Sequence, residues 1–338
     1  MAQIRIQELA ERMGISRTTV WKALHNRSGI SDDLRKRILE QASMEGIIRP
    51  AEGESAKPAA HRKSIAVAVS RMESSVFWMN IIHHIAIELS KRDVDLVYTY
   101  LPSSLVSDYH LPGTFNEVSG IIVMNVYDAP LLRLISQLPV PKVFLDTVPE
   151  VPYTELTGDL VIIEGREAVK QITKRLIEKG KTRLGFVGDP YYAHTNSDRL
   201  SGFHNAHLEK GIVFNPRYSL IRSINMNSYY HEISAFIDLL PELPDAFVCA
   251  SDFVAHYVLR RLKECGRKLP EGFTVTGFDN SAEFDYTANQ ITTADVQTAA
   301  IGRRLAHRIL YLSEYPESSR EVSYVVSNVI FRGGLENE

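Results

Sequence analysis

From Ser64 onward, short apolar runs alternate with amphipathic helical stretches, and this alternation constrains the fold more than any other feature of the chain. SIAVAVS, VDLVYTY, GIIVMNV and KVFLD each have the length of one strand, while FWMNIIHHIAIELSKR and APLLRLISQL have helical period. Continuous apolar strands separated by helices are typical of a parallel sheet that is covered on both faces. The chain is therefore expected to be an α/β protein.

The same alternation occurs a second time, with strand-like runs RLGFVGD, YSLIRS, AFVCASD and FTVTGFD. Because 338 residues exceed what one core usually serves, two tandem α/β lobes with parallel sheets are favoured over one very wide sheet. Open sheets of this kind bind ligands outside the carboxyl ends of their strands, so two facing lobes would form a binding cleft.

Residues 1–49 have a different pattern, with apolar residues at helical spacing throughout. The spacing predicts three short helices. Gly14 separates the first two, while Ser16 and Ser31 are placed to cap the second and the third. Residues 50–63, PAEGESAKPAAHRK, contain prolines, a glycine and charges without an apolar period, which predicts a linker.

The second of these helices, within GISRTTVWKAL, has an outer face that packing alone does not explain. Arg17, Thr18, Trp21 and Lys22 share this face, although threonine and tryptophan form helix less readily than alanine or glutamate. Residues 1–63 carry 12 Lys and Arg against 8 Asp and Glu, whereas the remainder carries 26 against 33. A basic unit of three helices fits a helix-turn-helix whose second helix enters the major groove of DNA.

Two kinds of DNA contact are expected from this unit. Arg17 and Lys22 can donate to guanine and Thr18 offers a hydroxyl and a methyl group, so these three are the candidate base readers. The candidates for phosphate contacts lie at or near helix starts and are Ser16, Thr19 and Ser31. Dimerisation would fix two half-sites, which predicts a near-palindromic double-stranded operator. The alternative is a solvated helix face on a small bundle that binds no nucleic acid.

Several blocks of the sequence resemble the lactose/galactose repressor (LacI/GalR) family over nearly the whole chain. IQELAERMGISRTTVWKALHNRSGISDDLRKRILEQASMEGIIRP is similar to the headpiece of that family, and RLGFVGD, RLSGF, CASD, KECGRKLPEGFTVTGFDN and QITTADVQ are similar to later blocks in the same order. The linker departs from the family, since it has no leucine and contains Pro58, which argues against a hinge helix that wedges a leucine into the minor groove.

The resemblance implies a domain organisation. A helix-turn-helix headpiece is expected at residues 1–49, a linker or hinge at 50–63 and a periplasmic-binding-protein-like effector and dimerisation domain at 64–338. The chain is expected to cross between the lobes three times, with an N-lobe at about 64–158 and 295–322 and a C-lobe at about 159–294 and 323–338. A homodimer or a higher assembly is implied as well.

The resemblance also implies ligand-binding roles in the cleft. Phe77 and Trp78 match an aromatic pair that stacks on the ligand, Arg199 matches a ligand-gripping arginine and Asp279 matches a hydroxyl-binding aspartate. Two further candidates are Ser251, at a position often held by asparagine, and Asn125, after the run GIIVM. An arginine, a carboxylate and an aromatic face suit a sugar.

Four of these candidates also have a structural interpretation. Phe77 and Trp78 would serve as ordinary core residues at a helix start, and Arg199 would pair with a nearby acid. Asp279 would stabilise the turn before Asn280. The sequence leaves these alternatives open.

The function predicted from these features is a sequence-specific DNA-binding transcription regulator, a repressor controlled by a sugar or sugar derivative between the lobes. The alternatives are a regulator of the same fold controlled by a protein partner, an enzyme and a transport binding protein. The chain has no GxGxxG, GxSxG or CxxC motif and no catalytic constellation, so no cofactor, metal or enzymatic activity is expected. Its charged start and the absence of a long apolar run predict a cytoplasmic protein outside the membrane.

Overall fold

The computed structural model describes residues 2–24, 27, 29–44, 63–70, 75–225 and 228–336. The chain forms two compact units, Met1–His61 and Arg62–Glu338, each with a core of its own. Apart from Lys63, the predicted linker and its hinge segment lie outside the described residues.

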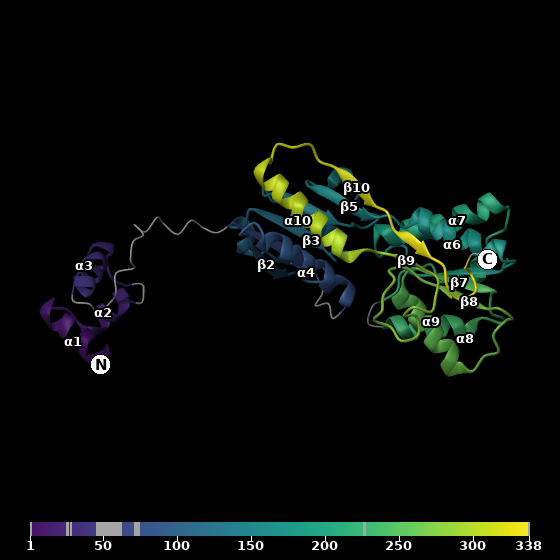
Figure 1. The fold of residues 1–338 in the computed structure, drawn as a ribbon, viewed down its shortest axis with the longest axis horizontal. Coiled ribbons are helices and arrows are strands. Elements are labelled where there is room, and N and C mark those ends of the chain that lie inside the picture. Colours follow the sequence, from purple (N-terminus) through teal and green to yellow (C-terminus); the bar gives the residue numbers. More distant parts are fainter. Residues whose placement is uncertain are drawn as a thin grey trace. The chain divides into compact units, whose positions relative to one another are not determined.

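The first unit contains the three helices that the sequence predicts, namely α1 (Ala2–Arg12), α2 (Arg17–Leu24) and α3 (Asp32–Met44) (Figure 1). Both predicted caps form. Ser16 Oγ accepts a hydrogen bond from the backbone N–H of Thr19 at 3.1 Å, and Ser31 Oγ accepts one from that of Leu34 at 3.3 Å. Gly14 has a φ of +65°, which glycine adopts without strain, and the chain turns there between α1 and α2.

A small apolar core holds these helices together. Its buried members come from all three helices and are Leu9, Ala10, Val20, Ala23, Ile38 and Ala42. They repeat at the spacing of one helix face, so the amphipathic pattern of the sequence accounts for the packing.

The second unit is an α/β domain with two lobes. The N-lobe contains a parallel sheet of six strands in the order β10-β5-β4-β3-β1-β2. Its strands are β1 (Ser64–Val69), β2 (Asp95–Tyr100), β3 (Gly120–Met124), β4 (Lys142–Leu145), β5 (Asp159–Ile163) and β10 (Val322–Val325). Helices α4 (Val76–Ser90) and α10 (Thr298–Glu314) pack on one face, and α5 (Ala129–Ser136) packs on the other.

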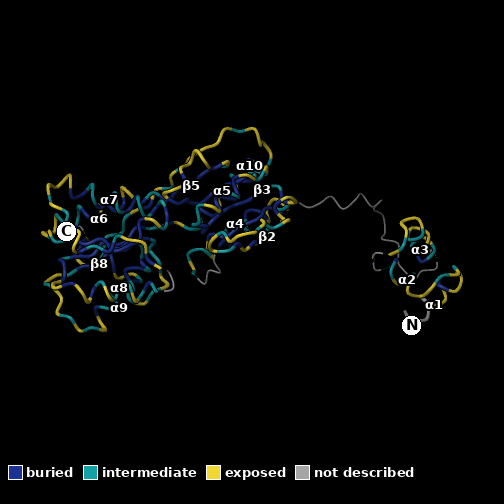
Figure 2. Tube along the Cα trace, turned by 180° about the vertical axis from the view of Figure 1, so that it is seen from behind, coloured by how far each residue is buried: buried dark blue, intermediate teal, exposed yellow. Residues whose placement is uncertain are grey.

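Strand β1 shows why the strands of this sheet are continuously apolar in sequence. Ile65, Val67 and Val69 pack into the core under α4 and α10, whereas Ala66 and Ala68 pack into the core under α5. Burial on both faces removes the need for polar residues at alternate positions. Figure 2 shows buried chain through the middle of the N-lobe and exposed chain mainly in the connections.

The C-lobe contains a parallel sheet of order β6-β7-β8 and a two-stranded antiparallel sheet, β9-β11. Its strands are β6 (Leu184–Val187), β7 (Ala246–Cys249), β8 (Thr274–Thr276), β9 (Thr293–Asp295) and β11 (Asn328–Ile330). Its helices are α6 (Arg166–Glu178), α7 (His194–Lys210), α8 (Tyr229–Leu239) and α9 (Asp252–Cys265). Helices α6 and α7 cover one face of the parallel sheet, and α8 and α9 cover the other. The predicted fold class, a helical headpiece with a two-lobed parallel α/β domain, is confirmed.

Two of the points at which the chain passes between the lobes lie later than the sequence predicts. Strands β5 and β10 pair with each other and belong to the N-lobe sheet, although the expected boundaries at about 158 and 322 place β5 and all of β10 after Val322 in the C-lobe. The N-lobe therefore extends to Ile163 and to Val325. The difference arises because an apolar run does not reveal which of two neighbouring sheets it joins.

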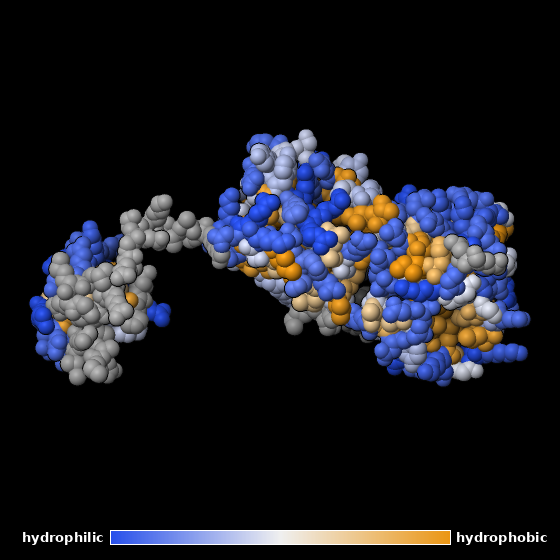
Figure 3. All heavy atoms as spheres, in the orientation of Figure 1, coloured by the Kyte–Doolittle hydropathy of each residue, from blue (hydrophilic) through white to orange (hydrophobic). Residues whose placement is uncertain are grey.

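Helix α10 illustrates how the helices face the sheet. Ile301, Leu305 and Ile309 are buried, whereas Arg303 and Arg304 are exposed. On the face drawn in Figure 3, the surface over α10 is accordingly hydrophilic.

Candidate functional site

The outer face of α2 carries the side chains predicted to read DNA bases. Arg17 and Thr18 are exposed and Lys22 is half-buried, while Val20 on the opposite side is fully buried. Trp21, on the same outer face, is 43% exposed, which leaves a large apolar area open to solvent. The helix therefore presents a mixed cationic and apolar surface.

The position of α2 is fixed through its backbone. The guanidinium of Arg35 in α3 donates to the backbone oxygen of Lys22 at 3.4 Å and to that of Arg27 at 2.7 Å. These bonds satisfy carbonyl groups at the carboxyl end of α2, where cations are favourable. The attachment of α2 to α3 thus needs no side chain of the candidate base readers.

The three candidates for phosphate contacts lie at helix starts, as the sequence indicates. Ser16 Oγ and Thr19 Oγ1 lie 2.8 Å apart at the start of α2, and Ser31 caps α3. Ser16 and Ser31 are exposed and Thr19 is half-buried. A helix N-terminus favours negative charge, so these positions are compatible with a phosphate partner.

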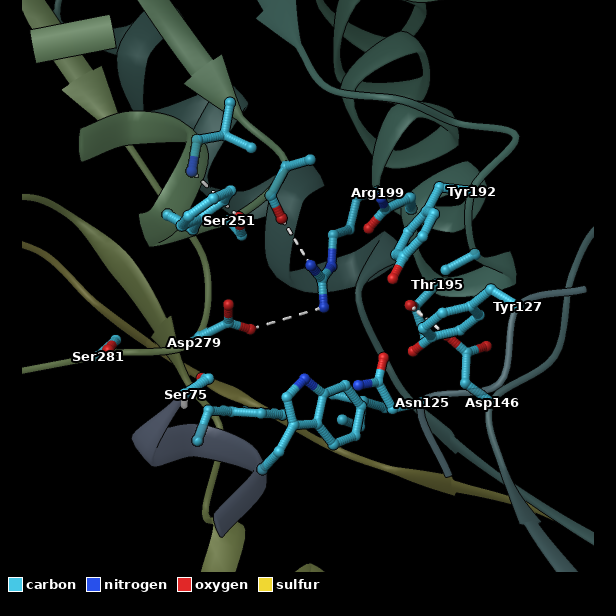
Figure 4. Close-up of a pocket in the computed structure, with 18 of the residues that line it drawn as sticks. Ser75, Asn125, Tyr127, Asp146, Tyr192, Thr195, Arg199, Ser251, Asp279 and Ser281 are labelled. Atoms are coloured by element: carbon cyan, nitrogen blue, oxygen red, sulfur yellow. Dashed lines mark hydrogen bonds and ion pairs between the residues drawn. The ribbon is translucent and has the colours of Figure 1, made fainter. Parts of the chain in front are cut away.

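In the second unit, a cavity of about 300 Å³ lies between the two lobes. It is lined by all six residues predicted to bind ligand, Phe77, Trp78, Asn125, Arg199, Ser251 and Asp279 (Figure 4). They come from the start of α4, the loop after β3, helix α7 and the ends of β7 and β8. The fold therefore brings them together at the carboxyl ends of the parallel strands.

Arg199 is held rigidly at the cavity. Its guanidinium donates to the backbone oxygen of Ala250 at 2.6 Å, lies 3.8 Å from a carboxylate oxygen of Asp279 and stacks 3.7 Å from the ring centroid of Phe278. Gly165 leaves room for it, since a Cβ there would lie 2.7 Å from Arg199 Cγ. These contacts fix the plane of the guanidinium and hence the direction of its N–H groups.

The carboxyl group of Asp279 is partly buried, which changes its pKa and suits it to accept a hydrogen bond. Burial raises its pKa to about 7, against the opposing effect of Arg199. Its φ of 112° is unusual for a residue with a side chain. Nearby, burial raises the pKa of Asp252 to about 6, although that carboxylate accepts bonds from Ser281 N at 2.7 Å and Thr293 Oγ1 at 2.9 Å.

Aromatic rings form much of the remaining wall. Phe77 and Trp78 meet edge to face with ring centroids 5.1 Å apart. Across the cleft, Tyr127 of the N-lobe packs against Tyr192 of the C-lobe with centroids 4.5 Å apart. The C-lobe adds Tyr229, Phe253 and Phe284. Such rings can cover the apolar face of a cyclic ligand.

Two lining acids that sequence reasoning missed connect the lobes. Asp146, after β4, accepts a hydrogen bond from Thr195 Oγ1 at 2.7 Å, close to the start of α7. Glu283, after β8, accepts bonds from the backbone N–H of Val76 at 3.1 Å and from Ser75 Oγ at 3.3 Å, at the start of α4. Each lobe thus places a carboxylate near the N-terminus of a helix from the other lobe, which is a favourable position for negative charge.

Ser251 and Asn125 line the cavity but also have local roles. Ser251 Oγ accepts a bond from Val254 N at 3.2 Å and so caps α9. Asn125 has a φ of +54° and its backbone oxygen accepts a bond from Ser70 N at 3.4 Å, which supports the turn after β3. Their side chains therefore contribute to the shape of the cavity whether or not they contact a ligand.

Comparison with known proteins places the whole chain in context. Residues 173–334 match a family model described as a periplasmic binding protein-like domain. The chain is 23% identical to the HTH-type transcriptional repressor PurR of Aliivibrio fischeri over 98% of both proteins. It also shares its fold with the Lac repressor dimer bound to operator and the anti-inducer ONPF, with a TM-score of 0.66 at 17% identity over 98% of each chain. The chain is thus similar to LacI-type transcriptional regulators over nearly its whole length.

The comparison supports the predicted resemblance. The chain also has the fold of the transcriptional regulator CelR in its cellobiose complex, with a TM-score of 0.67 and 20% identity over 97% of this chain and 98% of that one. These relatives are transcription regulators, as the sequence predicts for this chain. Among the described residues, no helix combines the length and the apolar character that crossing a membrane requires.

Proposed function

We propose that this LacI-type chain is a repressor that binds its operator through α2 and releases it when a sugar or sugar derivative occupies the inter-lobe cavity. The observation that carries the proposal is the convergence of Arg199, Asp279 and Trp78 on one cavity between two lobes. A ligand there contacts both lobes and can therefore favour one arrangement of the lobes over another. It acts only through its differential affinity for the two arrangements.

On the DNA side, Arg17, Thr18 and Lys22 are proposed to contact base edges. The phosphate contacts are assigned to Ser16, Thr19 and Ser31. A single headpiece of this size covers one half-site, so a homodimer on a near-palindromic operator is proposed. A cytoplasmic location is proposed with this function, because the protein must reach its DNA operator.

On the ligand side, the Arg199 and Asp279 pair offers donors and an acceptor side by side, which suits two neighbouring hydroxyl groups of a sugar ring. The aromatic wall suits the apolar face of the same ring. The solved structure of CelR with cellobiose supports this choice of ligand class.

The proposal is tested in two steps with the full chain. Selection of bound duplexes from a random pool should yield a near-palindromic motif. Calorimetry against a panel of sugars should then identify a ligand that weakens binding to that motif. If no sugar binds but a phosphocarrier protein does, control by a protein partner with a vestigial cleft replaces control by sugar.

A further inference from the structure

The charges that line the inter-lobe cavity are unbalanced. Among the described lining residues, Asp146, Asp279 and Glu283 are acidic, and Arg199 is the one basic residue. The guanidinium of Arg199 is already engaged by the backbone oxygen of Ala250 and the carboxylate of Asp279. Among these described residues, an anionic ligand would therefore meet the carboxylates of Asp146 and Glu283 beside an Arg199–Asp279 pair whose charges largely compensate each other.

The start of α4 is where a ligand anion would otherwise be expected to bind. Helix N-termini attract anions because their first backbone N–H groups are unpaired and the helix dipole is positive there. The 15-residue helix α4 opens onto the cavity, and its N-cap residue Ser75 makes no side-chain cap bond of its own. Glu283, which comes from the other lobe, takes that place by accepting from Val76 N and Ser75 Oγ.

We propose that Glu283 is a specificity-determining residue of the effector site. It fills the anion-binding start of α4 with the chain's own carboxylate and, together with Asp146 and Asp279, selects an uncharged sugar over its phosphorylated or carboxylated form. A phosphorylated ligand would have to displace Glu283 and break a contact that joins the lobes. This inference rests on the proposed function, because it names the ligand class of the same cavity.

The first test needs no knowledge of the effector. In the Trp21→Phe background, Trp78 in the first turn of α4 is the sole tryptophan and reports on that helix end. Sodium sulfate is titrated against sodium chloride at constant ionic strength, with fluorescence as the readout. Glu283→Ala and Glu283→Gln should show a saturable response to sulfate, whereas the background protein should bind sulfate at least about tenfold more weakly or without saturation. The control is Glu271→Ala, an exposed acid outside the cavity lining, which should behave as the background does.

Thermal unfolding of each variant shows whether the fold is kept, and the isosteric Glu283→Gln removes the charge with the least change in shape. Saturable sulfate binding by the background protein at the affinity of the Glu283 variants overturns the inference. Failure of both folded variants to gain sulfate binding overturns it equally.

The second test uses sugars in pairs. Glucose, galactose and cellobiose are compared with glucose 6-phosphate, galactose 6-phosphate and cellobionate, respectively, by calorimetry. We expect heat from neutral sugars only, and a smaller preference for the neutral form in Glu283→Gln. A phosphorylated sugar that binds the unmodified protein more tightly than its neutral parent overturns the inference while it leaves the proposed function standing. If the protein prefers no operator sequence, that result would instead contradict the proposed function.

Discussion

The outer face of α2 and the inter-lobe cavity use side chains in opposite ways. On α2, Arg17 and Thr18 extend into solvent from a helix whose other side packs on a core of few residues. In the cavity, Arg199 is 6% exposed and is held by a backbone oxygen, a carboxylate and an aromatic ring. The difference indicates that the proposed ligand-binding side chains are ordered before a ligand arrives, whereas the proposed base readers would be ordered by their partner.

The largest effect expected from this difference is that of Arg199→Ala. The substitution leaves Asp279 buried without its cation, so the free energy of unfolding of the effector domain should fall by about 3–5 kcal/mol, and effector binding should be lost. Denaturant unfolding and calorimetry measure the two quantities. Arg199→Lys is the matched control, since it keeps the charge without the planar fork and should recover only part of the stability. An unchanged unfolding midpoint for Arg199→Ala would contradict the difference inferred between the cavity and the outer face of α2.

We expect Arg17→Ala to reduce DNA sequence discrimination while it leaves the stability of the protein almost unchanged. The free energy of unfolding should change by less than about 0.5 kcal/mol because the side chain is exposed, but discrimination between the preferred base pair and its alternatives should fall by about 1–3 kcal/mol. Fluorescence anisotropy with single-substitution operators measures this loss. Lys36→Ala, an exposed cation on α3, should weaken binding to all sequences alike or not at all. Equal effects of the two variants on sequence preference would contradict the assignment of Arg17.

The raised pKa of Asp279 predicts a pH dependence for the cavity that the face of α2 lacks. A sugar hydroxyl donates to the ionised carboxylate, so binding lowers the pKa of Asp279 from about 7 and releases protons near neutral pH. Effector affinity should therefore rise by about tenfold from pH 6 to pH 8 and level off above that. Calorimetry in buffers of different ionisation enthalpy detects the released protons. Asp279→Asn should abolish the pH dependence, and its persistence would assign it to another group, with Asp252 the first to examine.

The smallest effect expected is that of a helix cap. Ser16→Ala removes the side-chain acceptor for Thr19 N at the start of α2, which should lower the stability of the headpiece by about 1 kcal/mol. Thermal unfolding followed by the fluorescence of Trp21, in a Trp78→Phe background, isolates the headpiece. Ser16→Thr keeps the acceptor and should behave nearly as the unmodified chain. No difference between the two variants would show that the cap contributes nothing measurable.

The sequence predicts best what depends on neighbouring residues. The three headpiece helices and the caps at Ser16 and Ser31 follow from local pattern, and they form as predicted. Strand β5 could not be assigned to its sheet from the sequence, because its pairing with β4 and β10 is a property of the assembled lobe.

The cavity shows the same limit. Five of its six predicted lining residues follow from family resemblance and Asn125 from its place after an apolar run, and the structure brings all six together. Asp146 and Glu283 could not be found in this way, because each acquires its role only by meeting the start of a helix from the opposite lobe. The spacing of residues in the sequence does not indicate such a contact between the two lobes. The double role of Ser251, which caps α9 and lines the cavity, was likewise beyond the sequence pattern.

The return of α10 and β10 to the N-lobe has a consequence for the synthesis of the chain. Ile301, Leu305 and Ile309 fill the layer between α10 and the first strands, and β10 completes the sheet beside β5. When only residues 64–163 of this domain have emerged from the ribosome, one face of the N-lobe sheet is thus still partly uncovered. That lobe keeps apolar surface open while the whole C-lobe is being made, so the nascent chain is more exposed to aggregation, or to chaperones, than the order of its segments suggests.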